Sequence, residues 1–134
     1  MKISEIEGIG PAYAAKLSKK AGIRSVEALL KNGATEKGRK EIEAATGITH
    51  ALILEWVNLA DLFRVKGIGS EYSDLLEEAG VDTVAELSKR VAENLYKKMV
   101  EVNTAKNLVN KMPGVVQVKK WIDQAKKLPK VVKY

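Results

Sequence analysis

Two stretches of the chain share one pattern, Ile6-Glu7-Gly8-Ile9-Gly10-Pro11 near the beginning and Val65-Lys66-Gly67-Ile68-Gly69-Ser70 in the middle. In each, two glycines flank one isoleucine, and a residue suited to a helix start follows. Glycine permits positive φ and close approach of two backbones, both of which a tight turn requires. Proline at a first helical position forfeits no hydrogen bond, since that N–H has no partner within the helix. The pattern predicts helix, tight turn and helix, with the isoleucine buried.

The similarity extends well beyond these two Gly-Ile-Gly turns. Ala21-Gly22-Ile23-Arg24-Ser25-Val26 aligns with Ala79-Gly80-Val81-Asp82-Thr83-Val84, and Trp56 aligns with Trp121. A repeat of this length is the signature of a duplicated unit. We therefore predict two similar halves, 1–61 and 62–134, packed as one compact unit.

Residues that begin and end helices recur throughout the chain. Glycines suited to left-handed helix ends are Gly22, Gly47 and Gly80. Residues suited to N-caps are Ser25, Thr35, Thr49 and Thr83. Apolar residues recur at helical spacing before the second turn and again after Pro113-Gly114, where Pro129 should end the last helix and leave 130–134 frayed. Because no stretch alternates apolar and polar residues as a strand would, we predict an all-α fold.

Composition limits the classes of function. The 134 residues include no cysteine, which excludes disulfides, thiolate metal sites and a thiol nucleophile. No long apolar run or leading signal segment is present, so we expect a soluble, cytoplasmic protein without membrane contact. Residues 67–96 carry seven acidic and two basic side chains, whereas residues 97–134 carry ten basic and two acidic ones. A partner would therefore meet an acidic middle and a lysine-rich end.

Gly8-Ile9-Gly10-Pro11, followed by Ala14 and Leu17, resembles the helix-hairpin-helix motif of proteins that bind DNA without sequence specificity. The Ala-Gly-x-x-Ser/Thr-Val-x-x-Leu element resembles the segment paired with such hairpins in the N-terminal domains of RecA-like recombinases. Taken whole, the chain resembles a family of small uncharacterised proteins built from duplicated helix-hairpin-helix units. The resemblance implies tandem SAM-domain-like repeats that hold the nucleic-acid backbone through turn amides, often with a monovalent cation on the turn carbonyls.

The two turns differ in the charges that follow them. Binding without base recognition depends on neutralising phosphates, so positive charge should lie beside the turn amides. Lysines follow the first turn, whereas Glu71, Asp74, Glu77 and Glu78 crowd the helix after the second. We expect the second turn to be structural, or to meet a basic protein surface such as the lysine-rich end. The nucleic-acid-binding residues proposed on motif and charge are Gly8, Ile9, Gly10, Lys16, Lys19, Lys20, Gly67, Ile68 and Gly69.

Other candidates have simpler explanations. Trp56 and Trp121 could stack on bases, but their place on apolar helix faces favours core packing. Gly38-Arg39-Lys40 could bind an anion, although a solvated first helical turn explains it better. His50, the only histidine, has no partner that the sequence identifies. The lysines near the end could follow a nucleic-acid backbone or form a solvated helix face; they are Lys119, Lys120, Lys126, Lys127, Lys130 and Lys133.

No arrangement of residues supports catalysis. The chain lacks a paired-carboxylate, Ser-His-Asp, zinc-ligand or phosphate-loop pattern, and the first turn lacks the third glycine of a dinucleotide fingerprint. We therefore expect no enzyme activity, cofactor or metal. The preferred hypothesis is non-sequence-specific binding of nucleic acid, DNA rather than RNA. The alternative is a protein-interaction or scaffold module, acting within a homodimer or on another protein.

Overall fold

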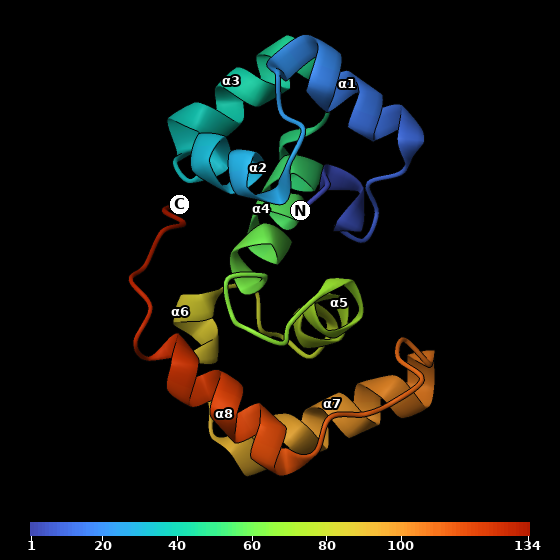
Figure 1. The fold of residues 1–134 in the computed structure, drawn as a ribbon, viewed down its shortest axis with the longest axis vertical. Helices are drawn as coiled ribbons and strands as arrows, with labels where there is room; N and C mark the ends of the chain where they lie inside the picture. Colours follow the sequence, from blue (N-terminus) through green and yellow to red (C-terminus); the bar gives the residue numbers. More distant parts are fainter. The chain divides into compact units, whose positions relative to one another are not determined.

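All regular structure in the protein is helical (Figure 1). The computed structural model describes residues Met1–Tyr134. A short 3₁₀ helix, η1 (Ile3–Glu5), precedes eight α-helices. These are α1 (Pro11–Ala21), α2 (Val26–Gly33), α3 (Glu36–Thr46), α4 (His50–Leu62), α5 (Ser70–Glu78), α6 (Val84–Leu87), α7 (Ala92–Lys106) and α8 (Val115–Ala125). The only β-type pairing is an isolated bridge between Lys2 and Ser25. The all-α prediction is confirmed.

None of these helices combines the length and the apolar character that crossing a bilayer requires.

The chain packs as two compact units. Unit 1 comprises Met1–Asp61 together with Val131–Tyr134, and unit 2 comprises Leu62–Lys130. The most deeply buried apolar side chains of unit 1 include Ile6, Leu17, Ile23, Leu29, Ile53 and Trp56. Those of unit 2 include Leu62, Leu75, Leu76, Leu87, Met99, Val118 and Trp121.

Side-chain caps start the helices where the sequence predicts them. The Ser25 hydroxyl accepts a hydrogen bond from the Ala28 N–H (3.0 Å) and starts α2. Thr35 and Thr83 do the same for the third residues of α3 and α6, at 3.1 and 3.3 Å. Each cap satisfies one of the backbone donors that a helix start leaves without a partner.

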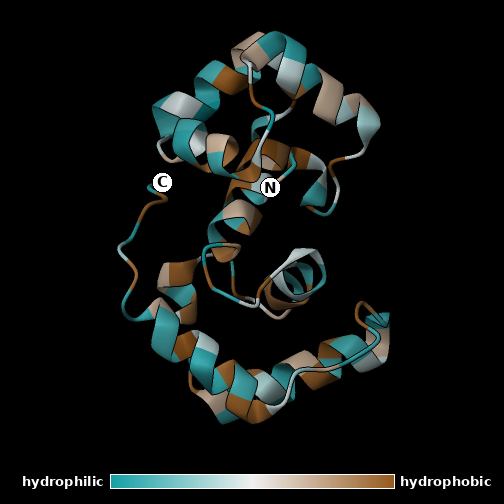
Figure 2. Ribbon diagram, viewed as in Figure 1, coloured by the Kyte–Doolittle hydropathy of each residue, from teal (hydrophilic) through white to brown (hydrophobic).

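Figure 2 shows hydrophobic and hydrophilic residues alternating along α8, as expected of a helix with one buried and one exposed face. Val118, Trp121, Ile122 and Ala125 form the buried side. The predicted apolar face is confirmed at these four positions. It is wrong at Val115, which is 37% exposed.

The predicted fraying of the last residues is wrong. Val132 is buried in unit 1, and the Lys133 N–H donates to the Ala34 carbonyl (2.7 Å). The Tyr134 hydroxyl donates to the Asn58 Oδ1 atom of α4 (3.3 Å). An apolar side chain and a backbone hydrogen bond therefore hold the tail on α2 and α4.

The predicted solvated position of Arg39 is also wrong, because this side chain is only 1% exposed. One guanidinium nitrogen donates to the Gly33 carbonyl at the end of α2 (2.8 Å), and another donates to the Lys133 carbonyl (2.7 Å). The Tyr134 ring lies 6.0 Å from the guanidinium carbon. A buried cation must replace its hydration with dipoles, and carbonyls from α2 and from the tail supply them.

Gly33 lets α2 lie against α4, which suggests a first prediction. A Cβ at position 33 would stand 2.4 Å from the Val57 Cγ2 atom, so Gly33→Ala should lower the free energy of unfolding by about 1–3 kcal/mol. Denaturant unfolding measures this change. Gly10→Ala is the control, because no atom lies within 4 Å of its added Cβ, and we expect it to stay within about 0.5 kcal/mol. Equal effects of the two substitutions would contradict the close contact.

Candidate nucleic-acid interface

The first Gly-Ile-Gly turn, between η1 and α1, is closed by one hydrogen bond and anchored by one side chain. The Ile9 N–H donates to the Ile6 carbonyl (3.1 Å), and Gly8 adopts a φ of 93° that favours glycine. Ile9 is buried, as predicted, whereas Gly8 and Gly10 are exposed. The turn therefore presents its backbone, and not its isoleucine, to solvent.

The start of α1 has open donors. The helix begins at Pro11 with no side-chain cap on its first turn. Its first backbone bond runs from the Ala14 N–H to the Gly10 carbonyl (2.9 Å). The N–H groups of Ala12 and Tyr13 precede this bond and have no acceptor in the protein. Such groups at a helix N-terminus suit an anion, since both the donors and the helix dipole favour negative charge.

A tryptophan supports each turn from inside. In unit 1, a Cβ on Gly8 would lie 3.2 Å from the Trp56 Nε1 atom, and the Tyr13 ring packs on Trp56 with centroids 5.0 Å apart. In unit 2, a Cβ on Gly67 would lie 3.1 Å from Trp121 Nε1, and the centroids of Tyr72 and Trp121 are 5.3 Å apart. Both tryptophans are 1% exposed, so the prediction of core packing is confirmed.

The outer face of α1 combines small and basic residues. Ala12 and Ala15 are exposed near the turn, and Lys16 and Lys19 are exposed further along the helix. Lys20, also exposed, completes the predicted set, and none of the three lysines forms an ion pair. Small side chains leave the amides accessible, and the free ammonium groups are available to neutralise an anionic strand.

One acidic residue lies within this first turn. Glu7 is exposed immediately before Gly8, at the position that Lys66 occupies in the second turn. Its carboxylate would repel a phosphate bound at the start of α1. It is the only group in the turn that opposes such binding.

The second turn, between α4 and α5, has similar backbone features but a different surface. Gly67 has a φ of 97°, the Ile68 N–H donates to the Val65 carbonyl (3.1 Å), and α5 begins after Gly69 without a side-chain cap. Glu71 and Asp74 stand at the positions that Ala12 and Ala15 occupy on α1. Phosphate binding beside these carboxylates would be unfavourable.

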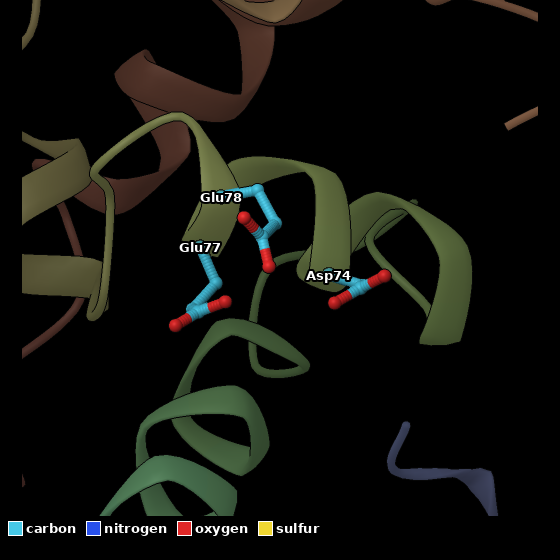
Figure 3. Close-up of side chains that lie close together, drawn as sticks. All are labelled: Asp74, Glu77 and Glu78. Carbon is cyan, nitrogen blue, oxygen red and sulfur yellow. The ribbon is translucent and has the colours of Figure 1, made fainter. Parts of the chain in front are cut away.

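The acidic residues of α5 gather on one side of the helix. Figure 3 shows Asp74, Glu77 and Glu78 together, and one carboxylate oxygen from each lies within 4.8 Å of the others. Glu78 pairs with Lys106 at the end of α7, which raises the pKa of the Lys106 ammonium group above its ordinary 10.5. On the alkaline side, the stabilisation from this pair is present below that ordinary value and is lost as pH rises through the raised pKa of Lys106. Three carboxylates on one helix, one of them paired with lysine, do not by themselves make a metal site.

The sequence analysis missed Gln124. Its Oε1 atom accepts a hydrogen bond from the Lys66 N–H (2.7 Å), so α8 satisfies a backbone donor of the second turn. The aligned residue in unit 1 is Leu59, which cannot do this for the Glu7 N–H. The available signal was a polar residue between Trp121 and Leu128 on an otherwise apolar helix face.

The remaining candidates are placed as follows. The His50 Nδ1 atom lies 3.7 Å from a Glu43 carboxylate oxygen at an exposed position. Five lysines near the end of the chain are exposed and form no ion pair, and they are Lys119, Lys120, Lys126, Lys127 and Lys130. Lys133 is exposed too, although its backbone is held by Ala34 and Arg39 in unit 1.

The contact with Gln124 yields a second prediction. Gln124→Leu removes the side-chain acceptor of the Lys66 N–H and, because this bond is exposed to solvent, should cost about 0.5–1.5 kcal/mol. Amide hydrogen exchange at Lys66 should accelerate accordingly. Gln117→Leu is the control, because Gln117 is exposed and makes no side-chain hydrogen bond, and it should leave this exchange unchanged. An unchanged Lys66 exchange rate in Gln124→Leu would show that the bond contributes nothing.

Comparison with known proteins provides one match. No curated protein and no solved structure matches the chain. A family described as a domain of unknown function, DUF4332, matches residues 7–128. This range includes both Gly-Ile-Gly turns and all eight α-helices. The chain therefore belongs to the DUF4332 family of domains of unknown function.

Proposed function

We propose that the protein binds the phosphate backbone of nucleic acid, DNA in preference to RNA, without reading the bases. The observation that carries this proposal is the open start of α1 beside a helix face with exposed lysines and no carboxylate. The resemblance of the first turn to the helix-hairpin-helix motif supports it and favours DNA.

Each part of this surface has a role in binding. A phosphate oxygen would accept hydrogen bonds from the open N–H groups of Ala12 and Tyr13, where Ala12 and Ala15 leave room for it. Lys16 and Lys19 follow along the same helix. Since an α-helix rises 1.5 Å per residue, Lys19 stands about 12 Å beyond Pro11 and would neutralise a neighbouring phosphate rather than the first one. Such contacts neutralise charge without recognising sequence.

The second turn contributes little to this function. Its glycines and isoleucine, Gly67, Ile68 and Gly69, match those of the first turn, and we propose that they serve the packing of unit 2. The carboxylates of α5 oppose a phosphate, and Gln124 already binds one of the turn's amides.

A protein-interaction module is the alternative function. The acidic cluster of Asp74, Glu77 and Glu78 favours it, because such a surface suits a basic protein or a second copy of this chain. Mass measurement across concentration and salt separates the two. Self-association that is lost at high salt, without any binding of DNA, would support the alternative.

The third prediction tests the turn itself. Gly10→Asp places a carboxylate at the N-cap, where the backbone is extended and no atom lies within 4 Å of the added Cβ. The new side chain should bond the open amides and support α1, so the variant stays folded while the anion site is filled. Because a hydrogen bond to a charged group contributes about 1.5–3 kcal/mol, duplex DNA affinity should fall at least about tenfold. Fluorescence anisotropy at constant salt measures it.

Gly69→Asp is the matched control for Gly10→Asp. It makes the same change of charge at the N-cap of α5, where an added Cβ also meets no atom within 4 Å. We expect DNA affinity to stay within about twofold of the unchanged protein, because the added carboxylate caps a helix whose turn takes no part in the proposed binding. Equal losses in the two variants would exclude the first turn as the binding site.

The fourth prediction concerns the α1 lysines. Replacing Lys16, Lys19 and Lys20 with glutamine should weaken DNA binding and flatten its dependence on salt. The slope of log affinity against log salt should fall by about 0.9 for each lysine that contacts duplex phosphate. Titrations between about 50 and 200 mM salt measure the slope. Lys97, Lys98 and Lys111, exposed in unit 2, provide a control with the same loss of charge.

Glu7→Gln tests the same surface in the opposite direction. Removing the one carboxylate of the first turn should tighten DNA binding, which a misfolded variant would not do. An unchanged salt slope in the triple lysine variant, or weaker binding by Glu7→Gln, would contradict the proposed surface.

A further inference from the structure

The outer face of α8 carries lysines that are not part of the binding site proposed at the first turn. The packing of this helix determines which residues it exposes. Trp121 and Gln124 face the second turn, where Trp121 lies against Gly67 and Gln124 binds the Lys66 N–H. Val118, Trp121, Ile122 and Ala125 are buried, and the exposed charged residues of the helix and of the turn after it are Lys119, Lys120, Asp123, Lys126 and Lys127.

These lysines form two rows. The Lys126 and Lys127 N–H groups donate to the Ile122 and Gln124 carbonyls, so the helical path continues for two residues past Ala125, the last residue of α8. Along this path, Lys119 and Lys126 fall on one side of Asp123, and Lys120 and Lys127 fall on the other. Within each row, seven residues of helix separate the ammonium groups by about 10 Å along the axis. No lysine of either row forms an ion pair, although Asp123 lies between them.

The two rows have different surroundings. Lys119 and Lys126 border a depression of about 280 Å³ that is also lined by Arg90 and by the carboxylates of Glu93 and Asp123. Lys120 and Lys127 do not line this depression, and Lys130 follows them just beyond the helix. The Lys119–Lys126 row therefore shares its surface with two carboxylates, which weaken its attraction for an anionic strand.

We infer that unit 2 has a second nucleic-acid contact, made by Lys120 on the outer face of α8 and by Lys127 in the turn that follows the helix. Unit 2 thus binds the backbone with a helix face in place of its turn, whose carboxylates oppose phosphate. Charge complementarity identifies the partner, because a row of unpaired ammonium groups matches a strand of regularly spaced phosphates. The inference takes the class of partner from the proposed function, but it concerns a different surface.

The fifth prediction tests this face. In the full chain, Lys120→Gln with Lys127→Gln should reduce duplex DNA affinity several-fold near 100 mM salt and lower the salt slope by about 1.8, or 0.9 for each contact. Lys97→Gln with Lys98→Gln is the matched control, since it removes the same charge from exposed positions on α7 of the same unit. The control should leave the slope unchanged. Equal slopes in the two double variants would overturn the inference.

Asp123→Asn provides a change of the opposite sign. Removing the carboxylate between the rows should tighten DNA binding, and this gain cannot come from unfolding. Val116→Ser tests a different partner, because Val116 is 66% exposed on the same helix and would contribute to a protein contact. DNA affinity unaffected by Val116→Ser supports the inference. The inference would be overturned if this face bound an acidic protein through Val116 and did not bind DNA.

The failure of this inference can be distinguished from failure of the proposed function. If Gly10→Asp weakens binding and the α8 pair does not, the first turn is the site and the α8 contact is wrong. If the α8 pair weakens binding and Gly10→Asp does not, the α8 contact stands and the proposed role of the first turn is wrong. If neither variant changes DNA affinity, both are wrong.

Discussion

A tryptophan packed beneath a glycine holds each Gly-Ile-Gly turn in shape. Gly8 and Gly67 have positive φ, and a Cβ at either position would come within 3.2 Å of an indole nitrogen. Each tryptophan arrives from a helix distant in the sequence. The turn therefore depends on the packing of that helix. The shape of the turn also determines where the following helix begins. The exposed amides of α1 depend on this contact, because the indole supports the turn from the side opposite to solvent.

The inner and outer sides of the turns obey different constraints. The inner side must fit an indole and bury an isoleucine, so it is nearly the same in the two units. The outer side has no such requirement, and its residues differ in charge, with Ala12 and Ala15 on α1 but Glu71 and Asp74 on α5. The inner face of each turn thus determines packing, and the outer face determines the charge that a partner meets. Similar turns can therefore belong to surfaces of opposite charge.

Polar side chains with specific partners decide details that hydrophobic packing leaves open. Arg39 is held by the carbonyls of Gly33 and Lys133, and Gln124 is held by the Lys66 N–H. Arg39 is buried and needs its partners at one position, since an unsatisfied charge in the interior is costly, whereas Gln124 and Lys66 meet near the surface. Arg39 therefore fixes the tail of the chain on unit 1, and Gln124 fixes α8 on the second turn.

The sequence by itself determined that the fold is all-α, the helix caps at Ser25, Thr35 and Thr83, and the burial of the two tryptophans. These features depend on local backbone preference and on apolar spacing, which are visible in a short stretch of residues. The tertiary structure alone decided that Arg39 is buried, that the tail is ordered, and which lysines of α8 share an exposed face free of ion pairs. The reason is that the partner of a buried charge can come from any part of the chain, and the sequence does not record which part folds back to meet it.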